Sequence, residues 1–408
     1  MSVRGCLAII TVFVLSVSCA GCGVAYEREY YVNGGIVFGV FDLDVWMLGR
    51  GSPAAYQKML DELGQINAGI NLTLNSPLRY LNEGAAVGEP VEVNYHTYRL
   101  MGLSAEYYKK TGGAFNIAVQ ALSELWCVDS TYSLNLSWHG VPQDFKLPAI
   151  ADAEAFKQAY LAFEDTDTPF GIEAYTQGGK YYVKKLAEGV KIDFGAIAKG
   201  YAVEVCMDIA KQSGARSAYV GIAGHNKIYG SYHNAEAGEE TDFTFAVTHP
   251  RSHGTRGSFF KENLFATAQS GEASVIASGD YERFFYYGSE EDGYLPICHI
   301  IDPFSGMPIG ISYNREAKAY AYDENAVVSA VIIDPSAIAA EAFATAACVY
   351  GFEDAVNLLK NSRLKSAVMT EQKIAFIGIT EADFFKPENP DYAGYKSYGE
   401  NIEFIAFE

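Results

Sequence analysis

Two short stretches of the sequence place a histidine, an arginine and carboxylates where they could do chemistry. His299 and Asp302 lie in "HIIDPFSGMP" (299–308), where the imidazole is a candidate proton carrier and the carboxylate could orient it or brace the turn. Arg283 closes "SGDYER" (278–283) and offers a forked donor for a phosphate or carboxylate. A lone histidine beside apolar residues is usually structural, so His299 needs partners before it can be given a role.

The stretch "KIDFGAIAKGYAVEV" (191–205) predicts a strand that ends near Asp193, a tight turn at Gly195 and a helix that begins near Ala196. Such a helix start presents unpaired backbone N–H groups and a positive dipole end, which suits a phosphate. Lys199 falls in the first turn, where a cation opposes the dipole unless an anion compensates. The alternative makes Asp193 a helix cap and Lys199 a solvated lysine, and these residues alone leave both open.

The helix expected in "AAEAFATAACVYG" (339–351) carries Glu341 and Thr345, which are four positions apart and so share one face. The other residues are nearly all apolar, so the helix is expected to be buried, and a buried glutamate needs a lysine or a metal ion. Carboxylate, hydroxyl and carbonyl oxygens suit Mg²⁺ better than zinc. A capped, partly exposed glutamate is the alternative, and the apolar composition favours the metal site.

Bulk composition limits the classes of ligand. The chain has 408 residues, is 49% hydrophobic and carries a formal net charge of −20. It is long enough for a large buried core, and its negative surface repels nucleic acid and anionic membranes. We therefore exclude nucleic-acid binding, and an anionic ligand would need a local positive site or a bound cation.

The N-terminus predicts export. Residues 7–17 (LAIITVFVLSV) are apolar throughout, too short to span a bilayer but suited to a signal peptide. "AGC" at 20–22 resembles a bacterial lipoprotein processing site, which would place a lipid on Cys22. The alternatives are an ordinary signal peptide cut after Ala20, or lipidation of Cys19. Residues 1–21 are thus predicted to be the signal peptide, 22–34 a tether and 35–408 the domain.

The elements that must position the candidate residues alternate without a repeat or a convincing linker. Their order favours an α+β fold in one compact, two-lobed domain. Strands are predicted at 34–49, 242–250, 326–333 and 402–407, helices at 53–65, 95–113, 198–210 and 336–350, and a hairpin at 180–194 that turns at 187–189.

Five motifs occur in an order that resembles one family. They are "TGGAFN" (111–116), "DFGAIAKGYA" (193–202), "SGDYER" (278–283), "HIIDPFSGMP" (299–308) and "EAFAT" (341–345), with "NSPLRYLN" (75–82) as an earlier element. Together they resemble the FAD:protein FMN transferases, the ApbE family, over about residues 36–380. Each motif alone is modest evidence, but their shared order is specific.

The resemblance implies an exported enzyme, anchored by a lipid in the periplasm or on the outer face of the cytoplasmic membrane. It implies a two-lobed α+β domain of mixed or antiparallel sheets, with FAD in the cleft between the lobes. With Mg²⁺, such an enzyme moves FMN from FAD onto a Ser or Thr of an acceptor protein and releases AMP. The acceptor motif D-G-x-[ST]-G-[AS]-T is absent from this chain, so we do not expect self-modification.

Carried across by position, the resemblance gives each motif a role. His299 would be the catalytic residue and would also contact FAD. The remaining roles are FAD contacts at Asp193 and Lys199, a flavin-site lining of Gly113, Ala114 and Phe115, and a metal held by the Ala196 carbonyl, Glu341 and Thr345.

Several positions depart from the family pattern. Glu341 stands where the family has aspartate, Ala196 replaces a glycine, and Ala223-Gly224-His225 stands where the family has G-G-[DN]. These changes bear on metal and flavin binding. Two alternatives therefore stay open: a Mg²⁺-dependent FAD pyrophosphatase, in which water replaces the acceptor hydroxyl, and a flavin-binding lipoprotein without catalysis.

Overall fold

A computed structural model describes much of the chain beyond the N-terminal segment. The described residues are 29–37, 40–49, 52–127, 145–161, 163, 167–234, 239–251, 263–289, 293–384 and 394–407. The predicted signal peptide, Cys19 and Cys22 lie outside them, so the lipidation site stays a prediction. Within the described part, no helix is long and apolar enough to cross a membrane.

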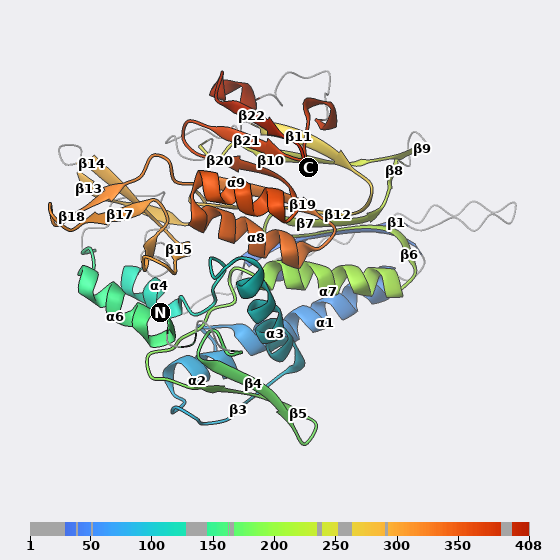
Figure 1. Ribbon diagram of the computed structural model, residues 1–408. Helices are drawn as coiled ribbons and strands as arrows, with labels where there is room; N and C mark the ends of the chain where they lie inside the picture. Colours follow the sequence, from blue (N-terminus) through green and yellow to red (C-terminus); the bar gives the residue numbers. More distant parts are fainter. Residues whose placement is uncertain are drawn as a thin grey trace, which may run out of the picture.

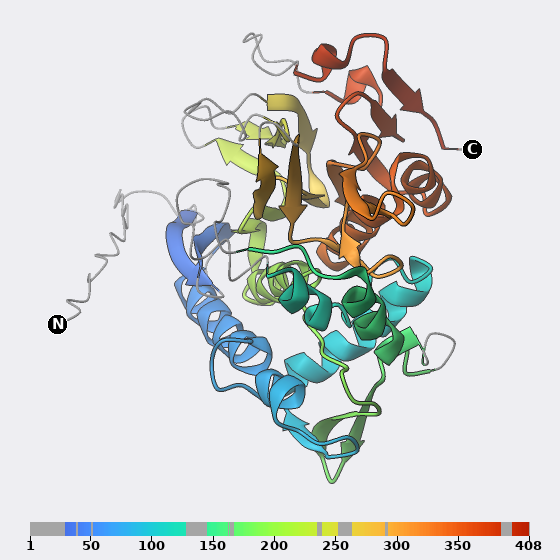
Figure 2. The same cartoon turned by 90° about the vertical axis from the view of Figure 1, so that its left-hand side faces the viewer.

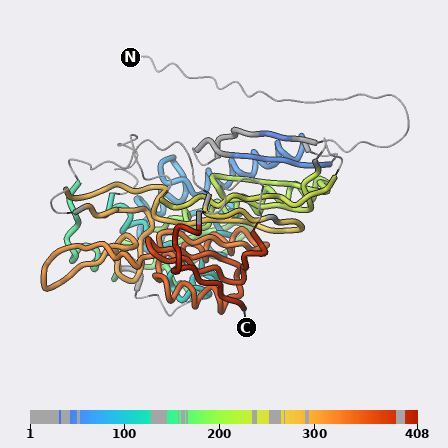
Figure 3. Tube along the Cα trace, turned by 90° about the horizontal axis from the view of Figure 1, so that it is seen from above, coloured from blue at the N-terminus to red at the C-terminus, as the bar shows by residue number. Residues whose placement is uncertain are grey.

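A nine-stranded sheet forms the centre of the molecule. All its strand pairs are antiparallel except the last, β21 with β22. Figure 3 shows it running from the N-terminal hairpin at one edge to the C-terminal strands at the other. In sheet order, the strands are β1 (Glu29–Val37), β2 (Val40–Gly49), β6 (Ala215–Ile222), β7 (His225–Gly230), β12 (Gly271–Gly279), β19 (Ser329–Asp334), β20 (Lys365–Met369), β21 (Ile374–Ile377) and β22 (Ile402–Ile405).

The sheet begins earlier than the sequence predicts. Residues 34–49 were expected to form one strand, but β1 and β2 form an antiparallel hairpin. Tyr31 pairs with Trp46, and Val32 pairs with Val45 and is buried. The segment 22–34 therefore cannot be tether throughout, because its last residues already pair in the sheet.

Helices cover one face of the sheet (Figures 1 and 2). The helix α7 packs on β6, α8 on β12 and β19, and α9 on β20, while α1 lies against α7. These helices are α1 (Ser52–Ile70), α7 (Ala198–Gln212), α8 (Ala337–Tyr350) and α9 (Phe352–Asn361). Apolar residues of the opposite face of the sheet, Trp46 and Phe376 among them, form a second core with strands β10 (Phe243–Thr248) and β11 (Asn263–Gln269).

A smaller α/β unit lies below α7 and α1 in Figure 1. Its three-stranded sheet has the order β3-β5-β4. Its elements are α2 (Pro77–Glu83), β3 (Val91–Val93), α3 (Tyr95–Lys110), β4 (Ile172–Gln177) and β5 (Lys180–Lys185). The predicted hairpin is displaced, because β5 pairs with the preceding β4 around a Gly178-Gly179 turn in which both φ angles are positive. Residues 186–194 therefore form no strand.

Short helices and hairpins complete the described part. They are α4 (Gln120–Trp126), α6 (Ile150–Leu161), β8 (Tyr232–Asn234) with β9 (Glu239–Thr241), β13 (Phe284–Ser289) with β14 (Gly293–Cys298), β15 (Ile301–Asp302) with β16 (Met307–Pro308), β17 (Ile311–Asn314) with β18 (Ala319–Tyr322), and the 3₁₀ turns η1 (Glu381–Asp383) and η3 (Gly394–Tyr398). The mixed α+β fold is the one the sequence predicts.

Candidate functional site

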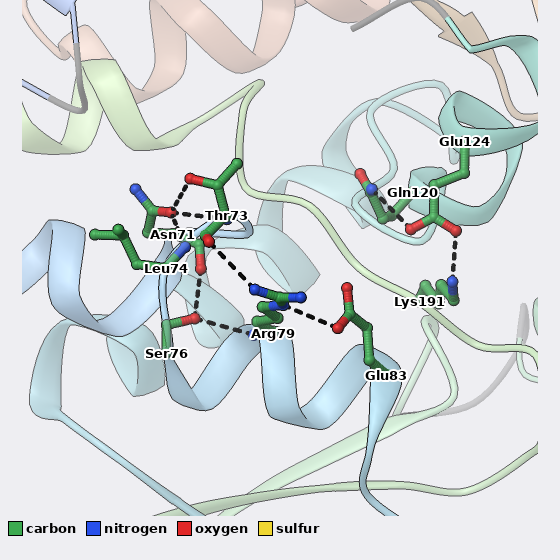
Figure 4. Close-up of polar contacts among 9 residues, drawn as sticks. All are labelled: Asn71, Thr73, Leu74, Ser76, Arg79, Glu83, Gln120, Glu124 and Lys191. Carbon is green, nitrogen blue, oxygen red and sulfur yellow. Dashed lines mark hydrogen bonds and ion pairs between the residues drawn. The ribbon is translucent and has the colours of Figure 1, made fainter. Parts of the chain in front are cut away.

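The segment before α7 has no sheet partner and is held by side chains and by a backbone hydrogen bond from the Asp193 N–H to the Ile117 carbonyl oxygen (2.8 Å). Asn82 of α2 accepts a hydrogen bond from the Ile192 N–H (3.0 Å) and donates to its carbonyl (2.8 Å). Lys191 pairs with Glu124 of α4 (Figure 4). These contacts fix Asp193, whose carboxylate accepts the Gly195 N–H at 3.0 Å. The strand expected here is wrong, but the turn follows as predicted and α7 begins at Ala198.

The helix that carries Asn82 is itself well anchored (Figure 4). Ser76 caps α2 by accepting the Arg79 N–H at 3.0 Å. The Arg79 guanidinium donates to the Thr73 carbonyl (3.2 Å) and pairs with Glu83 (2.9 Å). "NSPLRYLN" thus builds a rigid support. Sequence analysis recognised the motif but did not find the role of Asn82, which depends on a partner in another segment.

Glu341 is the best-connected charged group of the site. Its side chain, on α8, is 1% exposed. Its Oε1 contacts the Lys199 Nζ (2.9 Å) and the His225 Nε2 (3.0 Å), and its Oε2 accepts the Gly200 N–H (2.7 Å). This N–H belongs to the first turn of α7, so Glu341 caps α7 from the neighbouring helix. Gly200 permits that approach, because a Cβ there would lie 2.5 Å from the Ala337 carbonyl oxygen.

The surroundings keep Glu341 ionised. Burial acts to raise the pKa of its carboxyl, but the charges of Lys199 and His225 and the Gly200 N–H outweigh burial and lower the pKa to about 2. Of the two partners that the sequence left open, lysine or metal, the lysine is present. His225 is a second partner that sequence analysis noted only as a departure from the family pattern.

The carboxylate expected to hold the metal is paired with protein groups in this structure. The Glu341 Oε2 accepts the Gly200 N–H, while its Oε1 lies at ion-pair distance from Lys199 and His225 but makes no hydrogen bond. The Thr345 Oγ1 lies 3.3 Å from the Ser278 Oγ. Ala196 lies in the turn before α7. Across the described ranges, no three His, Cys, Asp or Glu side chains gather where they could hold a metal. The helix face shared by Glu341 and Thr345 is therefore present, but its carboxylate is already neutralised.

His299 is arranged as a neutral base. It is half-buried, and its backbone N–H and its Nδ1 lie 3.1 and 3.2 Å from the Arg283 carbonyl oxygen. Burial and the positive charges of Arg283 and Lys199 hold the pKa of His299 well below 6.5. An Nδ1–H that donates to the carbonyl leaves the lone pair on Nε2, which is the form that a general base needs.

Asp302 braces the turn after His299. Its Oδ1 accepts the Phe304 N–H (2.8 Å) and its Oδ2 the Ser305 N–H (3.2 Å). Burial raises the pKa of Asp302. Of the two roles considered for this carboxylate, orienting the imidazole or holding the turn, the observed contacts support the second.

The TGGAFN loop is only partly suited to line a flavin. Gly113 has φ +89° and lies beside the half-exposed Phe304. A Cβ added at Gly113 would lie 3.5 Å from the Phe304 ring. Ala114 (2% exposed) and Phe115 (0%) are part of the core. Their side chains therefore pack inside the protein, and Gly113 is the member of the predicted trio that borders an exposed ring.

The structure thus brings Lys199 and Glu341 into contact at 2.9 Å, and the Lys199 charge also lowers the pKa of His299. A cavity of about 640 Å³ lies elsewhere, between α1, α3 and α7. It is lined by Glu62, His96 and Tyr201 among others, and by none of the predicted site residues. We place the candidate site around Lys199, at the start of α7, because the charge of this lysine lowers the pKa of both Glu341 and His299.

Comparison with known proteins identifies the family. The ApbE family model matches residues 38–369, which include all the described candidate residues. The chain belongs to the ApbE family. It is 30% identical to the FAD:protein FMN transferase of Treponema pallidum over 292 residues, covering 70% of this chain and 68% of the relative. The corresponding Haemophilus influenzae protein is 22% identical over 378 residues, 91% of each chain.

Solved ApbE structures share the fold. The apo flavinyl transferase ApbE of Pseudomonas stutzeri superposes with a TM-score of 0.62 at 19% identity, covering 90% of this chain and 98% of that one. The Vibrio cholerae flavin transferase ApbE gives 0.60 at 19% identity, with 91% and 99% covered. Family membership and fold are therefore shown for this chain.

Proposed function

We propose that this ApbE-family chain transfers FMN from FAD to a Ser or Thr hydroxyl of an acceptor protein and releases AMP. The observation that carries the proposal is the half-buried His299, whose Nδ1 lies 3.2 Å from the Arg283 carbonyl oxygen and whose pKa is held well below 6.5 by burial and the charges of Arg283 and Lys199. A base for the hydroxyl proton and cations for the phosphates are the two requirements of phosphoryl transfer. Relatives named FAD:protein FMN transferase support the same activity.

In this proposal, the His299 Nε2 takes the proton of the acceptor hydroxyl. The hydroxyl oxygen forms a bond to the phosphorus of the FMN half, and the bond from that phosphorus to the bridging oxygen of the pyrophosphate breaks. AMP leaves with the bridging oxygen. Lys199 and the N-terminus of α7 stabilise the negative charge on the phosphate oxygens.

FAD is proposed to bind in the cleft between the two lobes. Asp193 and Lys199 lie at the start of α7 for contact with the nucleotide, and Gly113 and the exposed face of Phe304 border the flavin end. Ala114 and Phe115 can support the flavin end only by packing inside the protein, because their side chains are buried. The family resemblance also proposes Mg²⁺ at Ala196, Glu341 and Thr345. Since Glu341 is already neutralised, the steps above rest on the protein's own groups.

The proposed location is the exported face of a membrane, with a lipid on Cys22 as the anchor. The apolar residues 7–17 and the "AGC" sequence at 20–22 support it.

The experiment is an incubation of the protein with FAD, with and without a protein that carries the D-G-x-[ST]-G-[AS]-T motif. AMP release that needs the acceptor, together with flavin covalently bound to the acceptor, supports FMN transfer. AMP released equally without acceptor would assign the chain as an FAD pyrophosphatase. FAD binding without AMP in either mixture would leave a flavin-binding protein.

A further inference from the structure

The turn between β12 and β13 holds His299 through one backbone carbonyl. The His299 N–H and Nδ1 lie 3.1 and 3.2 Å from the Arg283 carbonyl oxygen. A carbonyl oxygen can only accept a hydrogen bond, so a neutral imidazole in this position carries its proton on Nδ1 and keeps the lone pair on Nε2. The place of this carbonyl therefore decides which nitrogen can act as a base. Residues 280–283, which carry it, belong to no strand, so other contacts must hold the turn.

Asp280 opens this turn and is buried, with 7% of its surface exposed. Its N–H donates to the Val328 carbonyl oxygen at 3.1 Å, and a Cβ at Gly279 would lie 2.6 Å from the same oxygen. Both oxygens of its carboxylate accept hydrogen bonds from Arg251, Oδ1 from Nη1 at 2.7 Å and Oδ2 from Nη2 at 2.9 Å. Such a pair of charge-assisted bonds fixes an angle as well as a distance. The sequence motif contains Asp280 but gives it no role.

Arg251 is itself held by segments that lie far from the turn in the sequence. Its guanidinium also donates to Glu371, between β20 and β21, from Nε at 2.8 Å and from Nη2. Its backbone N–H donates to the His249 Nδ1 (3.1 Å), and the His249 ring stacks on Tyr398 with 5.8 Å between the ring centres. Most of the five N–H donors of the guanidinium are thus used by two carboxylates, so Arg251 can act on the site only through them.

We propose that Arg251 is a positioning residue for the general base. By holding Asp280, it fixes residues 280–283, and the Arg283 carbonyl then keeps His299 in its Nδ1–H tautomer. The proposal rests on the proposed function, since that function makes His299 the base. A lysine at position 251 would keep the positive charge but could not hold both oxygens of Asp280 in one plane.

The test is the tautomer of His299, measured by long-range ¹H–¹⁵N spectra of protein labelled with ¹⁵N-histidine at neutral pH. The His299 signal, one of seven, is assigned by its loss in His299→Ala. The parent protein should show only the Nδ1–H tautomer. Arg251→Lys should fold, because the buried Asp280 keeps a cation beside it, but the Nε2–H tautomer should appear.

The same variant should separate the rate of transfer from FAD binding. In Arg251→Lys, kcat for FMN transfer should fall about 10- to 100-fold, because the base is misplaced. The dissociation constant for FAD should stay within about twofold of the parent value, since Arg251 is not assigned to the nucleotide. The matched control is Arg216→Lys, at an exposed arginine of β6 paired with Glu240, which should behave as the parent does.

The double variant Arg251→Gln/Asp280→Asn removes both charges of the pair, so it leaves no unpaired buried charge. It should also show both His299 tautomers, and it decides the question if Arg251→Lys does not fold by thermal melting. A folded variant in which His299 keeps only the Nδ1–H tautomer would overturn the proposal, as would a parent His299 protonated on Nε2. If neither variant folds, the pair is a requirement of the fold, and the proposal is equally overturned. A parent protein that transfers no FMN would contradict the proposed function, while the tautomers would still show whether Arg251 positions His299.

Discussion

At the scale of single residues, the site depends on which charges act on His299. The sequence indicated a candidate base, and its neutrality follows from burial, Arg283 and Lys199. The sequence also showed that Glu341 needs a partner, because its helix is apolar. It could not show which partner, since Lys199 and His225 come from segments that only the tertiary fold brings to α8.

Replacing His299 by alanine should lower the rate of FMN transfer by about 100- to 10,000-fold, because this removes the general base. FAD affinity should change little, since the phosphate contacts are assigned to other groups. Single-turnover transfer and FAD titration measure the two effects. His233→Ala, on β8, is the control and should keep full activity; near-normal transfer by His299→Ala would move the base role to another residue.

The pH dependence of kcat/KM should reflect the lowered pKa of His299. The base works unprotonated, so activity should stay level as the pH falls through 6.5 and should decline only at lower pH. Arg283→Gln removes one of the positive charges that lower the pKa, so the acid limb should move to higher pH. Arg315→Gln, at an exposed arginine, should leave the limb in place. Identical limbs in the parent and Arg283→Gln would contradict this electrostatic account.

At the scale of elements, one buried carboxylate and one glycine bring α7 and α8 into contact at the site. Both helices were predicted from their apolar spacing, and they begin within two residues of the expected positions. The displaced β4–β5 hairpin and the split β1–β2 strand were not predicted, because the choice of pairing partner depends on Gly178-Gly179 and on sheet neighbours beyond the local pattern.

Glu341→Ala should destabilise the protein by about 3 to 5 kcal/mol. The substitution leaves the buried His225 and the first turn of α7 without their acceptor. Urea unfolding measures the change. Glu353→Ala, on the exposed side of α9, should cost less than about 1 kcal/mol. A cost for Glu341→Ala no larger than that of the control would show that the cluster contributes nothing to the packing of α7 on α8.

The ionisation of Glu341 should make the free energy of unfolding depend on pH. Its pKa is about 2 in the folded protein against 4.5 ordinarily, so the ionised form stabilises the fold above pH 4.5. That contribution, on the order of 3 kcal/mol, should be lost as the pH falls from 4.5 towards 2. The difference in unfolding free energy between the parent and Glu341→Gln should therefore shrink over this range. A difference that is constant with pH would contradict the assignment.

Asn82→Ala should loosen the segment that carries Asp193. The variant leaves the buried N–H and carbonyl of Ile192 unpaired, at a cost of about 1 to 3 kcal/mol, and FAD affinity should fall with it. Unfolding and FAD titration measure both effects. The control Asn325→Ala, in an exposed loop, should change neither. An unchanged FAD affinity in Asn82→Ala would show that the contacts of Asn82 do not contribute to FAD binding.

At the scale of the whole molecule, the fold class followed from the order of helices and strands. The sheet order did not, because antiparallel pairs such as β7 with β12 join segments far apart in the sequence. Because the chain is strongly acidic, the positive groups at the α7–α8 junction are a local exception. An anionic nucleotide should therefore bind there.

Cys22→Ser should move the full-length protein from the membrane fraction to the soluble fraction, because the proposed lipid is its anchor. Fractionation of cells that express the parent and the variant measures this. Cys127→Ser, at an exposed cysteine within the domain, is the control and should stay with the membrane. A Cys22→Ser protein that also stays there would point to Cys19 or to another mode of attachment.

The most direct test of the central claim is the mass of an acceptor protein after incubation with this chain and FAD. The account predicts that the acceptor gains one FMN phosphoester on a Ser or Thr, that one AMP appears for each flavin attached, and that His299→Ala produces neither. An acceptor of unchanged mass, in a mixture where FAD demonstrably binds, would contradict FMN transfer as the function of this protein.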